Sequence, residues 1–245
     1  FMLEILYLII FPMLFHTIYP MSSGAIMNNM LMMLSLGFIM LERLNSDNAI
    51  KQFLIVIAGS VVFFLIPPIV KKKKLLKKTG FVMAIAGIVL LLITLVLGKT
   101  SFGANISFTI AGFTFQPSEF VKILFVLFVA SLISGGKDLK TIVVASIVAG
   151  IHIIILVAST DLGSSLIFFV VYLVMLYVGT GKIIYPAIGT MFGAGASVLA
   201  YNLFSHIKVR VLAWSNPWSD IDGKGYQITQ SLFAIGTGGF FGLGL

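Results

Sequence analysis

Long apolar stretches separated by short polar segments account for most of this chain of 245 residues. About eight of the stretches approach the roughly 20 residues that a helix needs to cross the hydrocarbon core of a bilayer. They are continuous, whereas the strands of a membrane β-barrel alternate over about ten residues. The pattern therefore predicts an all-α polytopic membrane protein with a single multi-pass domain over residues 1–245. The expected spans cover residues 3–19, 25–41, 53–70, 81–97, 116–132, 142–158, 166–178 and 183–204.

The composition supports this class and limits the choice of partners. Hydrophobic residues make up 59% of the chain and charged residues 10%, whereas soluble domains have about 25% charged residues. The net charge of +8 does not point to nucleic acid, because six of the sixteen Lys and Arg residues lie in residues 71–78, between two spans. A basic segment in that place orients a membrane protein and contacts membrane lipids. The chain contains no Cys, which excludes disulfides and thiolate metal sites.

The distribution of basic residues predicts the orientation in the membrane. Successive spans cross in alternate directions, so if residues 71–78 are cytoplasmic, the loop with Lys137 and Lys140 and the loop with Lys182 are cytoplasmic too. These three segments contain nine Lys, whereas the segments on the opposite side contain six basic residues. An excess of Lys and Arg in short loops marks the cytoplasmic side. The outer face then receives an irregular loop at 99–114, a tight connection at 159–163, and a large loop from about residue 205.

The large outer loop contains the strongest candidate for a chemical site. Its centre, residues 216–227, begins with Asn-Pro and contains Gly-Lys-Gly near its end, and both are turn signals that predict a folded loop. Asp220 and Asp222 are the outer carboxylates with basic residues on both sides in the sequence. Those basic residues are Lys208, Arg210 and Lys224. A carboxylate among cations suits a general base acting on an anionic substrate.

Two further polar features lie at the ends of predicted spans. Glu119 and Lys122 are three residues apart in the fifth span, so they share one helix face and can pair. They are interpreted either as a cap with a lysine that reaches the interface, or as a buried pair lining a polar cavity. Asp161 lies in the tight connection before the seventh span, where Ser159, Thr160 or Asp161 is expected to cap the helix.

Several motifs in this order resemble the SEDS family (shape, elongation, division and sporulation), which includes FtsW, RodA and SpoVE. The resemblance covers about residues 31–245, and the first span is similar to no part of the family's usual ten helices. The matching residues are Gln116-Pro117-Ser118-Glu119 with Lys122, Asp161-Leu162-Gly163, Arg210, Asn216-Pro217-Trp218-Ser219-Asp220, Gly223-Lys224-Gly225-Tyr226-Gln227, Gln230-Ser231 and Ala234-Ile235-Gly236-Thr237-Gly238-Gly239.

The resemblance implies a peptidoglycan glycosyltransferase in the cytoplasmic membrane of a bacterium. Such an enzyme polymerises lipid II onto a nascent glycan strand at the outer face, during division or elongation, together with a class B penicillin-binding protein. The family's essential aspartate matches Asp220, which is expected to be the general base or a ligand of a divalent cation, Mg²⁺ or Mn²⁺. The residues expected to bind substrate or its pyrophosphate are Arg210, Lys208, Lys224, Tyr226 and Gln227.

Two other functions are compatible with the same residues. A flippase or transporter of the lipid-linked precursor would place Glu119 and Lys122 at the centre of function. A scaffold that only recruits a synthase would need no essential carboxylate. The family continues for about three more helices beyond the point that matches Leu245, and no signal-peptide n-region follows Phe1, so the sequence is expected to be a fragment.

Overall fold

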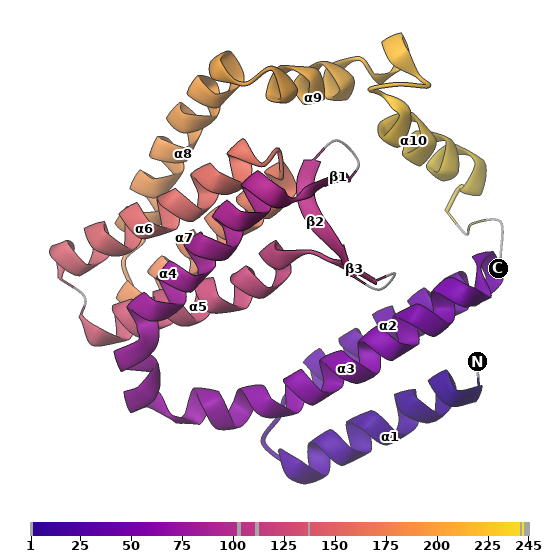
Figure 1. Cartoon of the computed structure of the whole chain (residues 1–245), viewed down its shortest axis with the longest axis horizontal. Coiled ribbons are helices and arrows are strands. Elements are labelled where there is room, and N and C mark those ends of the chain that lie inside the picture. Colours follow the sequence, from indigo (N-terminus) through magenta and orange to yellow (C-terminus); the bar gives the residue numbers. More distant parts are fainter. Residues whose placement is uncertain (1, 102–103, 111–112, 137, 241, 243–245) are drawn as a thin grey trace. The chain divides into compact units, whose positions relative to one another are not determined.

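The computed structural model describes residues 2–101, 104–110, 113–136, 138–240 and 242. The described chain is helical except for three short strands between α4 and α5 (Figure 1). It divides into two compact units, one that ends at Lys72 and one that begins at Lys73.

Seven of the described helices are long and apolar enough to cross a membrane. An eighth, α1 (Met2–Ile18), is apolar but has only 17 residues. These eight helices correspond to the eight expected spans, so the prediction of an all-α polytopic membrane protein is confirmed. The seven are α2 (Gly24–Leu44), α3 (Ser46–Lys71), α4 (Lys73–Leu97), α5 (Pro117–Gly135), α6 (Leu139–Ala158), α7 (Leu162–Thr180) and α8 (Ile184–Leu203).

In the first unit, aromatic side chains and two hydroxyl contacts join α1 to α3. The ring centroids of Phe15 and Phe63 are 4.8 Å apart, and those of Phe11 and Phe64 are 5.6 Å apart. The Tyr19 hydroxyl donates to the Phe64 carbonyl at 2.7 Å. Such aromatic pairs add about 0.5–1.5 kcal/mol beyond the area they bury, so they hold α1 against the longer helix.

In the second unit, α4, α5, α6 and α7 form a bundle around a fully buried aromatic core. Phe125, Phe128 and Phe168 are each at most 1% exposed, and His152 at 0% lies among them. The Nδ1 atom of His152 lies 2.8 Å from the Val148 carbonyl in its own helix. The core fixes how α5 and α7 lie next to each other, and the first turns of these two helices contain the Gln-Pro-Ser-Glu and Asp-Leu-Gly motifs.

The segment between α4 and α5 forms strands where an irregular loop was expected, so that expectation is wrong. The strands β1 (Lys99–Ser101), β2 (Ala104–Ile110) and β3 (Phe113–Phe115) pair antiparallel in the order β1-β2-β3. The register pairs Phe108 with Phe115 and Thr109 with Thr114. Aromatic and β-branched residues that alternate with polar ones favour such pairing, and the sequence from Asn105 to Ile110 has this alternation.

Two glycines let α8 approach α7 closely. A Cβ atom added at Gly189 would lie 2.5 Å from Cδ2 of Leu173, and one added at Gly193 would lie 3.0 Å from two ring carbons of Phe169. Small residues four apart commonly let membrane helices approach in this way.

We expect Gly193→Ala to weaken the packing of α8 on α7 by about 1–3 kcal/mol, because the new methyl group displaces the Phe169 ring. Gly195→Ala, two residues along the same helix, is the matched control, since no described residue beyond its own helical turn and chain neighbours lies within 4 Å of its added Cβ. Thermal unfolding of the purified protein in detergent measures both variants. Equal melting temperatures for the two would contradict the close approach at Gly193.

Candidate functional site

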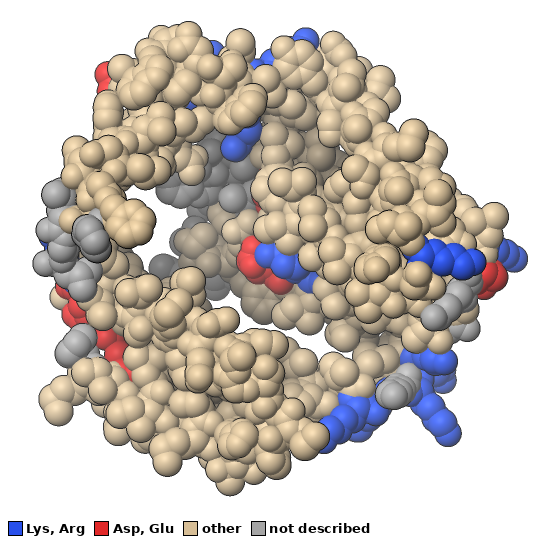
Figure 2. All heavy atoms as spheres, turned by 180° about the vertical axis from the view of Figure 1, so that it is seen from behind, with Lys and Arg blue, Asp and Glu red and all other residues tan. Residues whose placement is uncertain are grey.

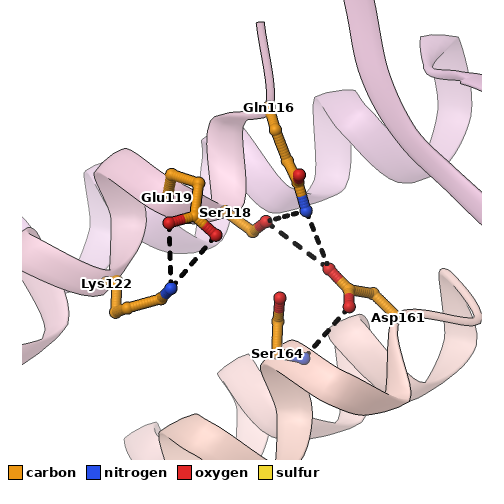
Figure 3. A network of polar contacts seen from close by, with 6 residues as sticks. All are labelled: Gln116, Ser118, Glu119, Lys122, Asp161 and Ser164. Atoms are coloured by element: carbon orange, nitrogen blue, oxygen red, sulfur yellow. Dashed lines mark hydrogen bonds and ion pairs between the residues drawn. The ribbon is translucent and has the colours of Figure 1, made fainter. Parts of the chain in front are cut away.

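A small polar network joins the first turns of α5 and α7 (Figure 3). One carboxylate oxygen of Asp161 accepts the Ser164 backbone N–H at 3.0 Å, so Asp161 caps α7 as expected. Its other oxygen accepts from the Gln116 amide at 3.4 Å and from the Ser118 hydroxyl at 3.5 Å. The Gln116 amide also donates to Ser118 at 3.0 Å. Gln116 and Asp161 are 45 residues apart in the chain. Their two motifs therefore meet at one end of the bundle.

Glu119 and Lys122, both in α5, form an ion pair beside this network (Figure 3). The Lys122 ammonium lies 3.0 Å from both carboxylate oxygens of Glu119. The side chains are 27% exposed for Lys122 and 55% for Glu119. The pair therefore exists, but the described residues do not enclose it. Glu119 lies in the first turn of α5, where the positive end of the helix dipole favours a carboxylate.

The exposure of this pair changes what its removal should do. An exposed ion pair contributes about 0.2–1 kcal/mol, whereas removing one partner of a dry pair costs about 3–5 kcal/mol, because the other charge stays buried and uncompensated. We expect Glu119→Ala and Lys122→Ala to keep nearly normal folded yield, because the charge that remains is hydrated, and to lose activity, because each variant removes one charge from this end of the bundle. Size-exclusion yield, and polymerisation of lipid II as the family resemblance implies, separate the two effects when both are measured on the same preparations. Full activity in both variants would exclude a functional role for the pair.

The outer loop is a folded unit of α9 (Ser205–Ser215), a 3₁₀ turn, η1 (Pro217–Asp220), and α10 (Tyr226–Gly238). The Asp220 carboxylate accepts the Lys224 backbone N–H at 3.0 Å, and the Asp220 carbonyl accepts the Gly225 N–H at 2.9 Å. Trp218 packs on Phe233 of α10, with ring centroids 5.8 Å apart. The loop therefore holds the Asp220 side chain in one direction.

Close approaches explain the Gly-Lys-Gly sequence in this loop. A Cβ atom added at Gly223 would lie 2.5 and 2.6 Å from the Asp220 carboxylate oxygens. One added at Gly225 would overlap the Pro217 carbonyl oxygen and lie 2.9 Å from the Asp220 carbonyl oxygen. Thr229 is 0% exposed and donates its hydroxyl to the Gly225 carbonyl at 3.1 Å. The turn therefore fits only with glycine at 225, where the added Cβ would meet backbone atoms, whereas at 223 it would displace the Asp220 carboxylate.

An open pocket of about 420 Å³ lies between α9 and α10. Three of the residues expected to bind substrate, Arg210, Lys224 and Gln227, line it together with Ser231. The remaining lining residues are Ala213, Ile228 and Leu232. Two cations, an amide and a hydroxyl around one hollow suit an anionic group such as a phosphate.

The other expected residues lie outside this pocket lining. Lys208 places its ammonium 6.0 Å from the centroid of the Tyr201 ring on α8. Tyr226 is 54% exposed, and Asp222 is also exposed. Asp220 does not line the pocket itself, but its hydrogen-bond donor Lys224 does. No hydrogen bond or ion pair among the described residues joins Asp220 to the Glu119 and Asp161 clusters.

Three contributors were not expected from the sequence. Ser118 bridges Gln116 and Asp161, Ser231 lines the pocket, and Thr229 fixes the turn. The position of Thr229, four residues after Gly225, is a weak signal for a hydroxyl that bonds back to a carbonyl one turn earlier. The other two hydroxyls belong to motifs that carry the family resemblance, but their spacing alone does not distinguish them from ordinary helix residues.

These features define a polytopic helical membrane protein with a charged site in the loop that follows its last long apolar helix. The family model for FtsW, RodA and SpoVE, described as "Cell cycle protein", matches residues 16–245, and the chain belongs to this family. It is therefore a multi-pass bacterial membrane protein. Most of α1 precedes the matched region.

Relatives and a solved structure agree with this assignment. The chain is 33% identical to "Peptidoglycan glycosyltransferase RodA" of Mycobacterium tuberculosis (strain ATCC 25618 / H37Rv) over 240 residues, which cover 86% of this chain and 51% of that protein. It is 33% identical to "Probable peptidoglycan glycosyltransferase FtsW" of Geobacter sp. (strain M18) over 177 residues, 69% of this chain and 48% of that protein. The chain thus spans about half the length of the curated relatives it matches.

A solved structure described as "Structural coordination of polymerization and crosslinking by a peptidoglycan synthase complex" superposes with a TM-score of 0.64 and 25% sequence identity. The superposition covers 84% of this chain and 62% of that one. This agreement over most of the chain supports the helix arrangement described above.

Proposed function

We propose that the protein is a peptidoglycan glycosyltransferase that polymerises lipid II at the outer face of the cytoplasmic membrane. The observation that carries the proposal is the loop that orients the Asp220 carboxylate through the backbone of Lys224, a residue that lines a pocket together with Arg210. A fixed carboxylate next to two cations suits the transfer of a sugar from a pyrophosphate carrier. The names of the relatives point to the same reaction.

In the proposed reaction, Asp220 accepts the proton from the 4-hydroxyl of one sugar. The oxygen attacks the anomeric carbon of the other sugar, a new C–O bond forms, and the bond from that carbon to the lipid pyrophosphate breaks. The pyrophosphate leaves with the bonding electrons, so it needs positive charge rather than a proton. Arg210 and Lys224 supply this charge in the pocket, with Gln227 as a further donor. A single displacement of this kind inverts the anomeric centre.

A divalent cation, Mg²⁺ or Mn²⁺, is compatible with these residues. The described residues contain no group of three His, Cys, Asp or Glu side chains that could hold a metal by themselves. Mg²⁺, however, commonly binds through one or two carboxylates together with substrate phosphates. Asp220 would be its protein ligand, and the ion would add positive charge at the leaving pyrophosphate.

The proposed partner is a class B penicillin-binding protein, which cross-links the strands that this enzyme makes. The support is the likeness to the chain in the peptidoglycan synthase complex, whose description joins polymerization and crosslinking. Lipid II and the nascent glycan strand are the proposed substrates.

A lipid-precursor flippase is the second candidate, because the Glu119–Lys122 pair lies in a membrane-spanning helix. The deciding experiment incubates the complete purified protein with labelled lipid II in the absence of any other polymerase. Long glycan chains on a gel are expected if the protein is a glycosyltransferase. Unchanged lipid II, together with lipid II translocation in proteoliposomes, would establish the flippase instead.

A further inference from the structure

A strongly basic surface lies where α4 begins, and the proposed reaction does not use it. Lys74, Lys77 and Lys78 are exposed in the first two turns of α4, and Lys71 and Lys72 directly precede this helix in the chain. None of Lys74, Lys77 and Lys78 forms an ion pair with a described residue. Figure 2 shows Lys and Arg atoms gathered at the lower right, toward the end of the molecule where α4 begins.

Contacts between helices bring another lysine to the same end of the second unit. The Ser131 hydroxyl of α5 donates to the Lys77 carbonyl at 3.5 Å, and a Cβ atom added at Gly179 of α7 would meet Ile133 of α5. The start of α4 and the ends of α5 and α7 are therefore neighbours. The exposed Lys182 follows α7 directly.

Acidic residues do not balance these charges. The described carboxylate at this end, Asp138, accepts from the Thr141 hydroxyl at 2.7 Å and from its backbone N–H at 3.1 Å, and it caps α6. These hydrogen bonds, from the Thr141 side chain first, hold the pKa of Asp138 below its usual value. Asp138 therefore stays anionic and supplies one negative charge, against four exposed lysines at this end: Lys74, Lys77, Lys78 and Lys182.

The positions of these lysines lower the stability of α4 as an isolated helix. Helix N-termini are positive and favour Asp or Glu, yet the first turn of α4 has no acidic residue and begins with Lys73 and Lys74. Lys74 and Lys78 are also four residues apart, a spacing at which like charges repel. Residues that destabilise the helix in which they lie usually have a functional role.

We propose that the exposed lysines at the start of α4 form a binding site for the headgroups of anionic phospholipids. The lysines lie at the end of a membrane-spanning helix, which places them at headgroup level, where a phosphate is the available anion. Basic residues beside a membrane helix attract anionic lipids by about 1 kcal/mol each. The site fixes this end of α4 in the leaflet that it faces.

The chain contains no Cys, so a single label reports on this site. Leu75, an exposed neighbour, is replaced by Cys and carries a fluorophore in the purified protein in nanodiscs. Quenching by brominated phosphatidylglycerol is compared with quenching by brominated phosphatidylcholine. We expect preferential quenching by the anionic lipid, and the preference should fall about fivefold for each lysine removed in Lys74→Gln/Lys78→Gln.

Two further variants decide the interpretation. Lys74→Arg/Lys78→Arg keeps the charges and should keep the preference for the anionic lipid. Arg43→Gln/Lys51→Gln removes the same charge elsewhere and should leave the preference unchanged. If the Lys74→Gln/Lys78→Gln variant retains the full preference, or if the Arg43→Gln/Lys51→Gln variant loses as much, the lysines only orient the helices during insertion and the proposal fails.

Discussion

Replacing Asp220 by Asn in the complete protein is expected to reduce polymerisation by about 10²- to 10⁴-fold, the usual contribution of a positioned general base. The substitution is nearly isosteric, and an amide oxygen can accept the Lys224 N–H as the carboxylate does at 3.0 Å. The loop should therefore keep its fold while losing the group that takes the proton. Initial rates with labelled lipid II and the melting temperature of the same preparations test both halves of this expectation.

Asp222→Asn is the matched control, because Asp222 is two residues away and exposed. It should retain most of the activity. A purified Asp220→Asn enzyme that still polymerises lipid II at a normal rate would end the assignment of Asp220. Loss of activity in Asp222→Asn alone would move the role of general base two residues along the chain.

The second large effect is expected from Gly225→Ala, which changes no functional group. Its methyl group would overlap the Pro217 carbonyl oxygen and crowd the Asp220 carbonyl oxygen. Both are backbone atoms, so the turn has to move rather than a side chain. Because a displacement of about 1 Å can cost about 10²-fold in rate, we expect at least that loss of activity.

Gly236→Ala provides the control for this prediction, since its added Cβ has no neighbour within 4 Å in the described part of the chain outside its own helical turn. Ala is favoured over Gly within a helix by up to about 1 kcal/mol, so this variant should be as stable as the parent and fully active. Hydrogen exchange of residues 216–225 should rise in Gly225→Ala only. Unchanged exchange and unchanged activity in Gly225→Ala would show that the turn is not held as described.

The sequence predicted the membrane helices and the Asp161 cap because these follow from local patterns. Continuous apolar runs identify spans, and a carboxylate directly before a helix identifies a cap. The strands at 99–115 were missed because their alternation is short and follows a long helix, although Phe108, Ile110, Phe113 and Phe115 alternate with polar residues.

The geometry of the site was less predictable, because it depends on packing between distant segments. The meeting of Gln116 with Asp161 depends on how α5 lies against α7, and the sequence contains no measure of that. The exposure of Glu119 also depends on neighbouring helices. By contrast, Arg210 and Lys224 could be proposed together, because they flank Asp220 in the sequence.

Lys224 takes part in the outer loop through two chemically independent groups. Its backbone N–H binds the Asp220 carboxylate, and the residue is one of those that line the pocket. An uncharged side chain other than proline therefore removes the cation and leaves the backbone N–H that binds Asp220 in place. Alanine at this position reports on neutralisation of the leaving group. Proline removes both the cation and the N–H, so the further loss from alanine to proline reports on the orientation of the base, and two substitutions of one codon separate the two contributions.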